Sequence, residues 1–294
     1  MRLYYCDHFE IPLPPGHKFP MEKYRLLRER IAREGFWDLE PATPAPLDTI
    51  ALAHDPEYVK HFVEGTLSPA AMRRIGFPWS EGLVKRTLAS AGGTLAGGTH
   101  HAFRAEGSGF CVFNDVAIAI HSLRAQDRAQ KFAVVDLDVH QGDGTAHFFE
   151  HDPGVLTISL HGANNFPFRK QRSKIDVELP DQTGDDAYLH ALDSVLPRVL
   201  DFAPDIVFYL SGVDALASDV LGRLALTQEG LKARDTRVIR SCCGRFPLVI
   251  TLGGGYSKPI ELTAEAHANT FRIAAGIYGA VKPSGSGRPP FSSP

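Results

Sequence analysis

Two aspartates and a histidine of this chain have the types and spacing that bind a catalytic metal ion. In Val134-Val135-Asp136-Leu137-Asp138-Val139-His140, an apolar run ends in carboxylate and imidazole side chains. Side chains two positions apart lie on the same side of a strand, so Asp138 and His140 can contact one ion. Asp214, at the end of another apolar run, supplies a third ligand. Two carboxylates and one imidazole leave a position open for water or substrate, which is typical of a catalytic zinc site.

The charge of such a site indicates that further groups take part in its chemistry. Zn²⁺ bound by two aspartates is formally neutral, so we expect it to acidify bound water less than a site of three histidines would. A general base and a separate donor to the developing oxyanion are then needed. Tyr256 follows three glycines, which permit close approach of the backbone, and its hydroxyl can donate to that oxyanion.

Two adjacent histidines, His100 and His101, are candidates for the general base. They follow Gly97-Gly98-Thr99 in a predicted loop, where an irregular backbone lets both side chains reach the same cavity. Asp136 and Asp143 could each fix the tautomer of one histidine and raise its basicity, as carboxylates do in hydrolytic dyads. The sequence thus has a residue for each function that the metal alone does not supply.

Short apolar runs alternate with amphipathic stretches of helical period, which predicts an α/β fold with a mostly parallel sheet between helices. Ligands bind at the carboxyl ends of the strands in such sheets, so we expect the polar clusters after the runs to converge. Strands are predicted at 131–138, 154–160, 205–211 and 246–252, with weaker candidates at 2–6 and 49–53. Helices are predicted at 20–34, 55–64, 80–95, 114–125, 185–200, 227–242 and 259–278, and the longest loops at 98–109 and 161–183.

The bulk composition favours a single catalytic domain over residues 1–282, followed by a disordered tail, 283–294, that is rich in Gly, Pro and Ser. A net charge of −3 gives no global positive field of the kind that drives nucleic-acid binding. No run approaches the roughly 18 apolar residues of a membrane span. The four cysteines lack the spacing of a structural zinc site, and the start of the chain lacks a secretion signal, so we expect a cytoplasmic location.

Five motifs in a fixed order give the chain a resemblance to the zinc-dependent histone deacetylase family, within the arginase-like fold group. This likeness implies a three-layer α/β/α fold and hydrolysis of an N-acyl amide bond. It covers the chain from the N-terminus through the last predicted helix. The motifs are Gly97-Gly98-Thr99-His100-His101-Ala102, Ser108-Gly109-Phe110-Cys111-Val112-Phe113-Asn114-Asp115, Asp136-Leu137-Asp138-Val139-His140-Gln141-Gly142-Asp143-Gly144-Thr145, Ser211-Gly212-Val213-Asp214 and Gly253-Gly254-Gly255-Tyr256.

The resemblance implies a role for each residue of these motifs that carries chemistry. Asp138, His140 and Asp214 match the zinc ligands, and Tyr256 matches the tyrosine that stabilises the transition state. The general base and the electrostatic histidine correspond to His101, supported by Asp143, and to His100, supported by Asp136. Substrate contacts are implied for Gly109, Phe110, Phe166 and Gly254, with the two phenylalanines as opposite walls of a tunnel.

Two further sites are implied by the family. A structural potassium ion is expected near the zinc strand, with ligands that include backbone oxygens, and Lys18 resembles a basic residue beside an internal channel that releases acetate. The residues that match the potassium ligands are Asp136, Asp138, His140, Ser159 and Leu160.

Two departures from the family pattern bear on the substrate. Many members have a second histidine where this chain has Gln141, and this difference, with the segment Arg74-Ile75-Gly76-Phe77-Pro78-Trp79, resembles the class IV branch and its bacterial relatives. The acidic rim residue that holds the peptide backbone in several eukaryotic members has no convincing counterpart here. We expect the partner to be an acylated lysine of a peptide or protein, or alternatively an acetylated polyamine or another small acylated amine.

Three other readings are open on the sequence alone. A metal-holding scaffold or acyl-lysine reader would lack Tyr256 or the histidine pair, and both are present. An arginase-like enzyme with two manganese ions needs more metal-binding residues than the motifs supply. Ser159 and Ser211 suggest a serine hydrolase, but neither lies in a GxSxG motif. The length of the acyl chain and the oligomeric state stay open.

Overall fold

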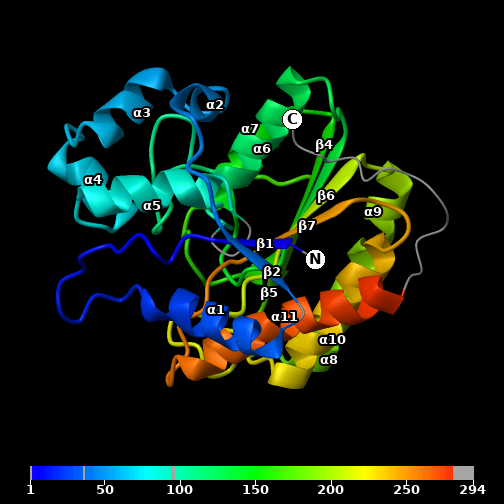
Figure 1. The fold of residues 1–294 in the computed structure, drawn as a ribbon. Coiled ribbons are helices and arrows are strands. Elements are labelled where there is room, and N and C mark those ends of the chain that lie inside the picture. Colours follow the sequence, from blue (N-terminus) through cyan, green and yellow to red (C-terminus); the bar gives the residue numbers. More distant parts are fainter. Residues whose placement is uncertain (1, 36, 94–96, 281–294) are drawn as a thin grey trace.

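A parallel sheet of five strands lies at the centre of the computed structural model, which describes residues 2–35, 37–93 and 97–280 (Figure 1). The strand order is β5-β4-β3-β6-β7. The four main predicted strands are confirmed, whereas β5 lies in the stretch 161–183 that the sequence predicts as a loop. The strands are β3 (Phe132–Asp136), β4 (Val155–Gly162), β5 (Ile175–Leu179), β6 (Ile206–Leu210) and β7 (Leu248–Thr251).

Side chains of the central strands alternate between two hydrophobic cores. On β3, Ala133 and Val135 belong to one core, while Phe132 and Val134 belong to the other. All residues of β3, β4 and β6 are buried. Because both faces of the sheet are covered, these strands read as continuous apolar runs without the alternation of a half-exposed strand.

Helices cover both faces of the sheet, which confirms the three-layer α/β/α architecture (Figure 1). The core that contains Val135 is closed by α1 (Glu22–Glu34), α8 (Asp185–Val195), α9 (Pro197–Phe202), α10 (Gln228–Cys242) and α11 (Glu261–Ala280). The core that contains Val134 is closed by α2 (Leu47–Ala51), α3 (Pro56–Val63), α4 (Pro69–Ile75), α5 (Glu81–Ala91), α6 (Asp115–Ala125) and α7 (Asp143–Phe149). None of the helices in the described ranges is long and apolar enough to cross a membrane.

The N-terminal segment contains one confirmed and one wrong strand prediction. Strand β1 (Arg2–Tyr5) is present and pairs in parallel with β2 (Asp38–Pro41), a polar strand that the sequence does not predict. The strand predicted at 49–53 is wrong, because this segment forms α2. Ile50 and Ala53, three residues apart, are both fully buried, so the short apolar run has a helical face.

Helix boundaries follow local chemistry. Asp55 caps α3, as predicted, by accepting hydrogen bonds from the backbone N–H groups of Glu57 and Tyr58. The helix predicted at 185–200 is two helices, and α9 begins at Pro197, whose ring suits a first helical position. The helix predicted at 80–95 ends at Ala91. Its last two residues, like the predicted tail 283–294, lie outside the described residues.

Candidate active site

The carboxyl ends of four neighbouring strands meet at one edge of the sheet, and predicted site residues follow them. Asp136 ends β3 and is paired with Ser159 of β4 and Leu210 of β6. Asp214 follows β6, and Tyr256 follows β7. The strand order β4-β3-β6-β7 therefore brings these segments together, as expected for an open parallel sheet.

Asp138, His140 and Asp214 form a group that can hold a metal ion. One ligand atom from each lies within 4.8 Å of the others, and His140 Nδ1 is 3.0 Å from Asp138 Oδ1 and 3.1 Å from Asp214 Oδ2. The side chains of Asp138, Asp214 and His140 are 1%, 0% and 12% exposed. Two buried carboxylates are costly without a cation, so their packing against one imidazole fits a bound metal. The donor set suits zinc.

The loop after β3, and not the strand itself, brings the first two ligands together. Because β3 ends at Asp136, the premise that Asp138 and His140 share one side of a strand is wrong. Asp138 Oδ1 instead accepts a hydrogen bond from the backbone N–H of His140 at 3.0 Å. Asp214 Oδ1 accepts one from the N–H of Val139 at 2.9 Å, so the third ligand is tied to the same loop.

Gly254 packs against both carboxylates of the group. Its backbone N–H donates to Asp138 Oδ2 at 2.5 Å. A Cβ atom at this position would lie 1.7 Å from Asp214 Oδ2, which no side chain can do. The glycines before Tyr256 are therefore needed for close approach to the metal group.

The histidine pair lies beside this group, and each histidine contacts one aspartate. His100 Nδ1 is 2.7 Å from Asp136 Oδ2, and His101 Nδ1 is 2.7 Å from Asp143 Oδ1. The two rings are 4.1 Å apart between centroids, and all four side chains are buried. These contacts fix the orientation of each ring, and both rings line the same cavity as Asp138 and His140.

The surroundings of the two histidines separate their charge states. Burial lowers the pKa of His100, but the Asp136 and Asp138 carboxylates outweigh burial and raise this pKa to about 9. Burial and the adjacent His100 lower the pKa of His101 to about 4, against the opposing effect of Asp143. These surroundings thus favour the imidazolium form of His100 and the neutral form of His101.

Tyr256 lines the same cavity as Asp138 and His140. Its backbone N–H donates to Asp219 Oδ2 at 2.6 Å, an anchor that no motif of the sequence indicates. Burial, together with the Asp214 and Asp138 carboxylates, raises the pKa of Tyr256 well above its usual value. The phenol therefore keeps its proton at neutral pH and is a hydrogen-bond donor.

An open mouth of about 780 Å³ leads from the surface to Tyr256 and His140. Its lining includes Gly109, Phe110 and Phe166, three residues with implied substrate contacts. A Cβ atom at Gly109 would lie 2.6 Å from a ring carbon of His101, so only glycine allows this wall to pack on the histidine. The two phenylalanines give the mouth the apolar walls that a methylene chain would contact.

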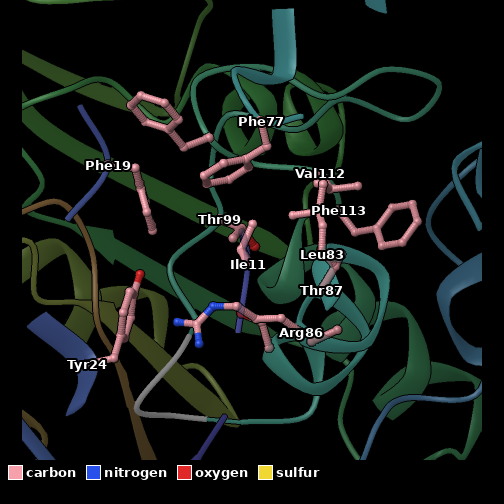
Figure 2. A pocket seen from close by; sticks show the side chains of 13 residues that line it. Ile11, Phe19, Tyr24, Phe77, Leu83, Arg86, Thr87, Thr99, Val112 and Phe113 are labelled. Carbon is pink, nitrogen blue, oxygen red and sulfur yellow. The ribbon is translucent and has the colours of Figure 1, made fainter. Parts of the chain in front are cut away.

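The described residues also line two small inner cavities of about 50 Å³ each. One is lined by the metal group residues Asp138 and His140. The other is largely apolar, with Phe19 and Phe77 on one side and the Arg86 guanidinium near Tyr24 (Figure 2). Arg86 lies 4.3 Å from the centroid of the Tyr24 ring.

Lys18, which resembles a basic residue beside an internal channel, lines neither inner cavity, whereas Lys23 lines one and Arg86 lines the other. Lys18 is exposed and lines the outer mouth. Lys23 is 2% exposed, lines the cavity beside the metal group and donates to the Gly253 carbonyl at 3.2 Å. A sequence signal for Lys23 existed, because it lies four and eight residues before Leu27 and Ile31 on the buried stripe of α1.

The residues that match potassium ligands lie on β3, on β4 and in the loop after β3. Asp136 and Ser159 are paired across the sheet. Ser159 Oγ is 2.9 Å from His161 Nδ1, and both side chains are buried away from the mouth. The potassium site, with Leu160 as a further ligand, stays a prediction.

Arg234 on α10 is a buried cation that the sequence analysis missed. It is 0% exposed, and its Nη1 atom donates to the carbonyls of Gly212, at 2.6 Å, and Leu137, at 3.2 Å. These carbonyls belong to the loops that carry Asp138 and Asp214. Asp235 accepts from Arg234 Nε at 2.9 Å and balances the charge. Adjacent opposite charges on a helix are usually solvated, so no sequence signal distinguished this pair.

Replacing Arg234 with Lys should lower the free energy of unfolding by about 2 kcal/mol, because a lysine cannot reproduce the fork that contacts two carbonyls and a carboxylate. Zinc affinity should fall as well, because the loops that carry Asp138 and Asp214 lose the guanidinium that contacts both of them. Chemical denaturation and a zinc titration measure both effects. Arg237→Lys on the same helix is the control, because Arg237 makes an exposed ion pair with Asp193 and should change stability little. Equal effects of the two substitutions would contradict the anchoring role.

The sequence of this chain is similar to one protein family and to several known proteins. The family described as "Histone deacetylase domain" matches residues 81–273. A "Histone deacetylase-like amidohydrolase" of Pseudomonas aeruginosa is 30% identical and covers 84% of this chain and 74% of its own length. An uncharacterized protein of Picosynechococcus is 43% identical, over 93% of this chain and 98% of its own length.

A solved structure shows the same fold. The crystal structure of a histone deacetylase homolog from Aquifex aeolicus superposes with a TM-score of 0.78. It covers 96% of this chain and 85% of the other, at 22% sequence identity. At this identity the likeness supports the fold alone.

Proposed function

The chain belongs to the histone deacetylase family, and we propose that it is a zinc-dependent amidohydrolase acting on N-acylated amines. The substrate we propose is an acyl-lysine of a peptide or protein. One observation carries the proposal: the buried group of Asp138, His140 and Asp214 lies at the inner end of an open mouth, beside the His100 and His101 pair. A metal-capable group, a neutral base and a protonated phenol together suit hydrolysis of an amide.

The residues of the site would divide the reaction between them. Asp138, His140 and Asp214 would hold a zinc ion, which would supply a Lewis acid for the amide carbonyl and the attacking water. His101, neutral and held by Asp143, takes a proton from that water as it attacks. The Tyr256 hydroxyl donates to the carbonyl oxygen as negative charge develops there. His101 or His100 then returns a proton to the leaving amine.

The shape of the mouth supports a linear amine as the substrate. Phe110 and Phe166 line it together with His101 and Tyr256, so an extended methylene chain would pass between apolar walls before reaching the metal. The adjoining inner cavity of about 50 Å³ has room for a small acyl group beside Lys23 and Gly253. We therefore expect acetyl to be preferred over long acyl chains.

Turnover of one fluorogenic lysine peptide bearing acyl chains of increasing length, beside acetylated polyamines, tests the proposal. The zinc-loaded protein should release the acetyl group from the peptide and should act progressively less well on longer chains. Absence of turnover on every acylated amine would contradict the proposed activity. Faster turnover of the acetylated polyamines than of the acetyl-lysine peptide would instead identify a polyamine, and not lysine, as the amine of the substrate.

Two finer assignments are proposals of the same kind. The described residues contain one three-ligand metal group of His, Cys, Asp or Glu, which supports one catalytic ion and not a pair of manganese ions. A potassium ion at the residues that match the family's ligands would be structural. A cytoplasmic location stays a prediction from the sequence alone.

A further inference from the structure

Among the described residues, every charged side chain that lines the outer mouth, apart from its histidines, is cationic. These cations are Lys18, Arg73, Arg74 and Arg223, and the described lining contains no aspartate or glutamate. This is unusual for a protein with a net charge of −3. The entrance to the proposed active site therefore has a charge opposite to that of the chain as a whole.

Two of these four cations are balanced, and two are not. Arg74 makes an ion pair with Glu106, and Arg223 Nη1 is 3.1 Å from Asp181 Oδ2. Lys18 and Arg73 are exposed, and neither forms an ion pair or a side-chain hydrogen bond with the described residues. The mouth thus keeps a net positive charge.

The unbalanced cations belong to segments that are held together at the mouth. Arg73 is in the last turn of α4. The next two residues of that helix accept backbone hydrogen bonds from the wall of the mouth. Gly109 N–H donates to the Arg74 carbonyl at 3.2 Å, and Phe110 N–H donates to the Ile75 carbonyl at 2.8 Å. The residue before Lys18 is also tied to this place, because His17 Nε2 is 2.9 Å from the Gly76 carbonyl. The backbone next to both cations is therefore held at the wall of the mouth.

The nearby carboxylates do not cancel this charge. Asp219 is turned inward, where its carboxylate accepts backbone N–H groups of Leu221, Gly222 and Tyr256. Glu22 lines the groove next to the mouth, and so do the two cations Lys18 and Lys258. Among the described residues, the lining of the mouth itself therefore contains no carboxylate that offsets Lys18 and Arg73.

We propose that this basic rim, Lys18 and Arg73, makes the protein select acyl-lysines that are flanked by acidic residues. The inference rests on the proposed function and names its substrate class. Negative charge beside the acyl-lysine is attracted to the rim and speeds productive encounter, whereas the protonated amines of an acetylpolyamine are repelled by it. Lys18 and Arg73 are specificity-determining residues and take no part in the bond-breaking step.

Three peptides that differ only in the residues flanking one acetyl-lysine, two Glu, two Gln or two Lys, test the inference on the zinc-loaded full chain. The Glu peptide should exceed the Lys peptide in kcat/KM by about 10-fold at low salt, mostly through KM, and the ratio should shrink at high salt. Turnover of the uncharged Gln peptide reports the proposed activity independently of the rim. Equal kcat/KM values for all three peptides would overturn the inference and leave the activity intact.

The double variant Lys18→Glu, Arg73→Glu should reverse the order of the Glu and Lys peptides while kcat on the Gln peptide stays within about twofold. Arg198→Glu is the matched control. Arg198 is exposed on α9, which leads into the amino end of β6, at the sheet edge opposite the mouth. An unchanged order in the double variant, or the same reversal in the control, would overturn the assignment of the rim.

Discussion

Replacing Tyr256 with Phe is expected to lower kcat by about 10²–10³-fold, the usual loss when one donor to a developing oxyanion is removed. The substitution deletes a single oxygen. The phenol is kept protonated by burial and by the carboxylates of Asp214 and Asp138, so it is a donor throughout the neutral range. A hydroxyl that contacted only the ground-state substrate would change KM more than kcat.

Zinc binding should survive this substitution. Tyr256 contributes no atom to the Asp138, His140 and Asp214 group, and it is anchored through its backbone N–H, which a phenylalanine retains. Its ring contacts, 6.3 Å from the Phe110 centroid, are also retained. The expected variant is therefore folded, metal-loaded and slow.

Single-turnover and steady-state rates on the acetyl-lysine peptide, with zinc content measured on the same sample, check this prediction. Tyr278→Phe is the control. Tyr278 lies 17 residues beyond the start of α11, roughly 25 Å along the helix, and its hydroxyl has no partner among the described residues. Near-normal kcat in Tyr256→Phe would exclude the donor role, and loss of zinc would show that the tyrosine acts on the fold.

The sheet could be predicted from the sequence because it is buried on both faces. A strand such as β3, with Phe132 and Val134 in one core and Ala133 and Val135 in the other, has no polar position and reads as an apolar run. Strand β2 is partly exposed and carries Asp38, Glu40 and Pro41, so no apolar pattern marks it. The segment that forms α2 was wrongly predicted as a strand because it is an apolar run. A helix of five residues is too short for its apolar residues to distinguish it from a strand.

The residues of the site that could be predicted are those of unusual type at a strand end. Asp136, Asp138, Asp214 and the glycine-rich turn before Tyr256 belong to this class, whereas the paired histidines are marked by their adjacency in a glycine-rich loop. Lys23, Arg234 and Asp219 were missed because their roles depend on tertiary contacts. Arg234 reaches two carbonyls from a helix, and Asp219 accepts the N–H of a residue 37 positions away. Only Lys23 left a trace in the sequence, as a charge on a buried helical stripe.

Replacing Asp214 with Asn is expected to remove the metal and to lower kcat by about 10³-fold or more, since a catalytic metal supplies several kcal/mol of transition-state stabilisation. The two oxygens of Asp214 have different partners, which makes the substitution selective. Oδ1 accepts the backbone N–H of Val139 at 2.9 Å, and an asparagine oxygen can keep this bond. Oδ2 faces His140 Nδ1 at 3.1 Å, and an amide group in its place cannot bind a cation.

Zinc stoichiometry, kcat on the acetyl-lysine peptide and thermal unfolding with and without added zinc measure the effect of Asp214→Asn. A ligand at 1,000 times its dissociation constant stabilises the native state by about 4 kcal/mol, so zinc should raise the melting temperature of the native sequence and leave that of the variant nearly unchanged. Asp205→Asn is the control, because Asp205 also accepts backbone N–H groups, of Gln130 and Lys131, but at the opposite edge of the sheet. If Asp214→Asn kept one zinc ion per chain and near-normal turnover, the metal would lie elsewhere. A variant that loses zinc, keeps its fold and loses turnover would show that the three-residue group is where the metal acts.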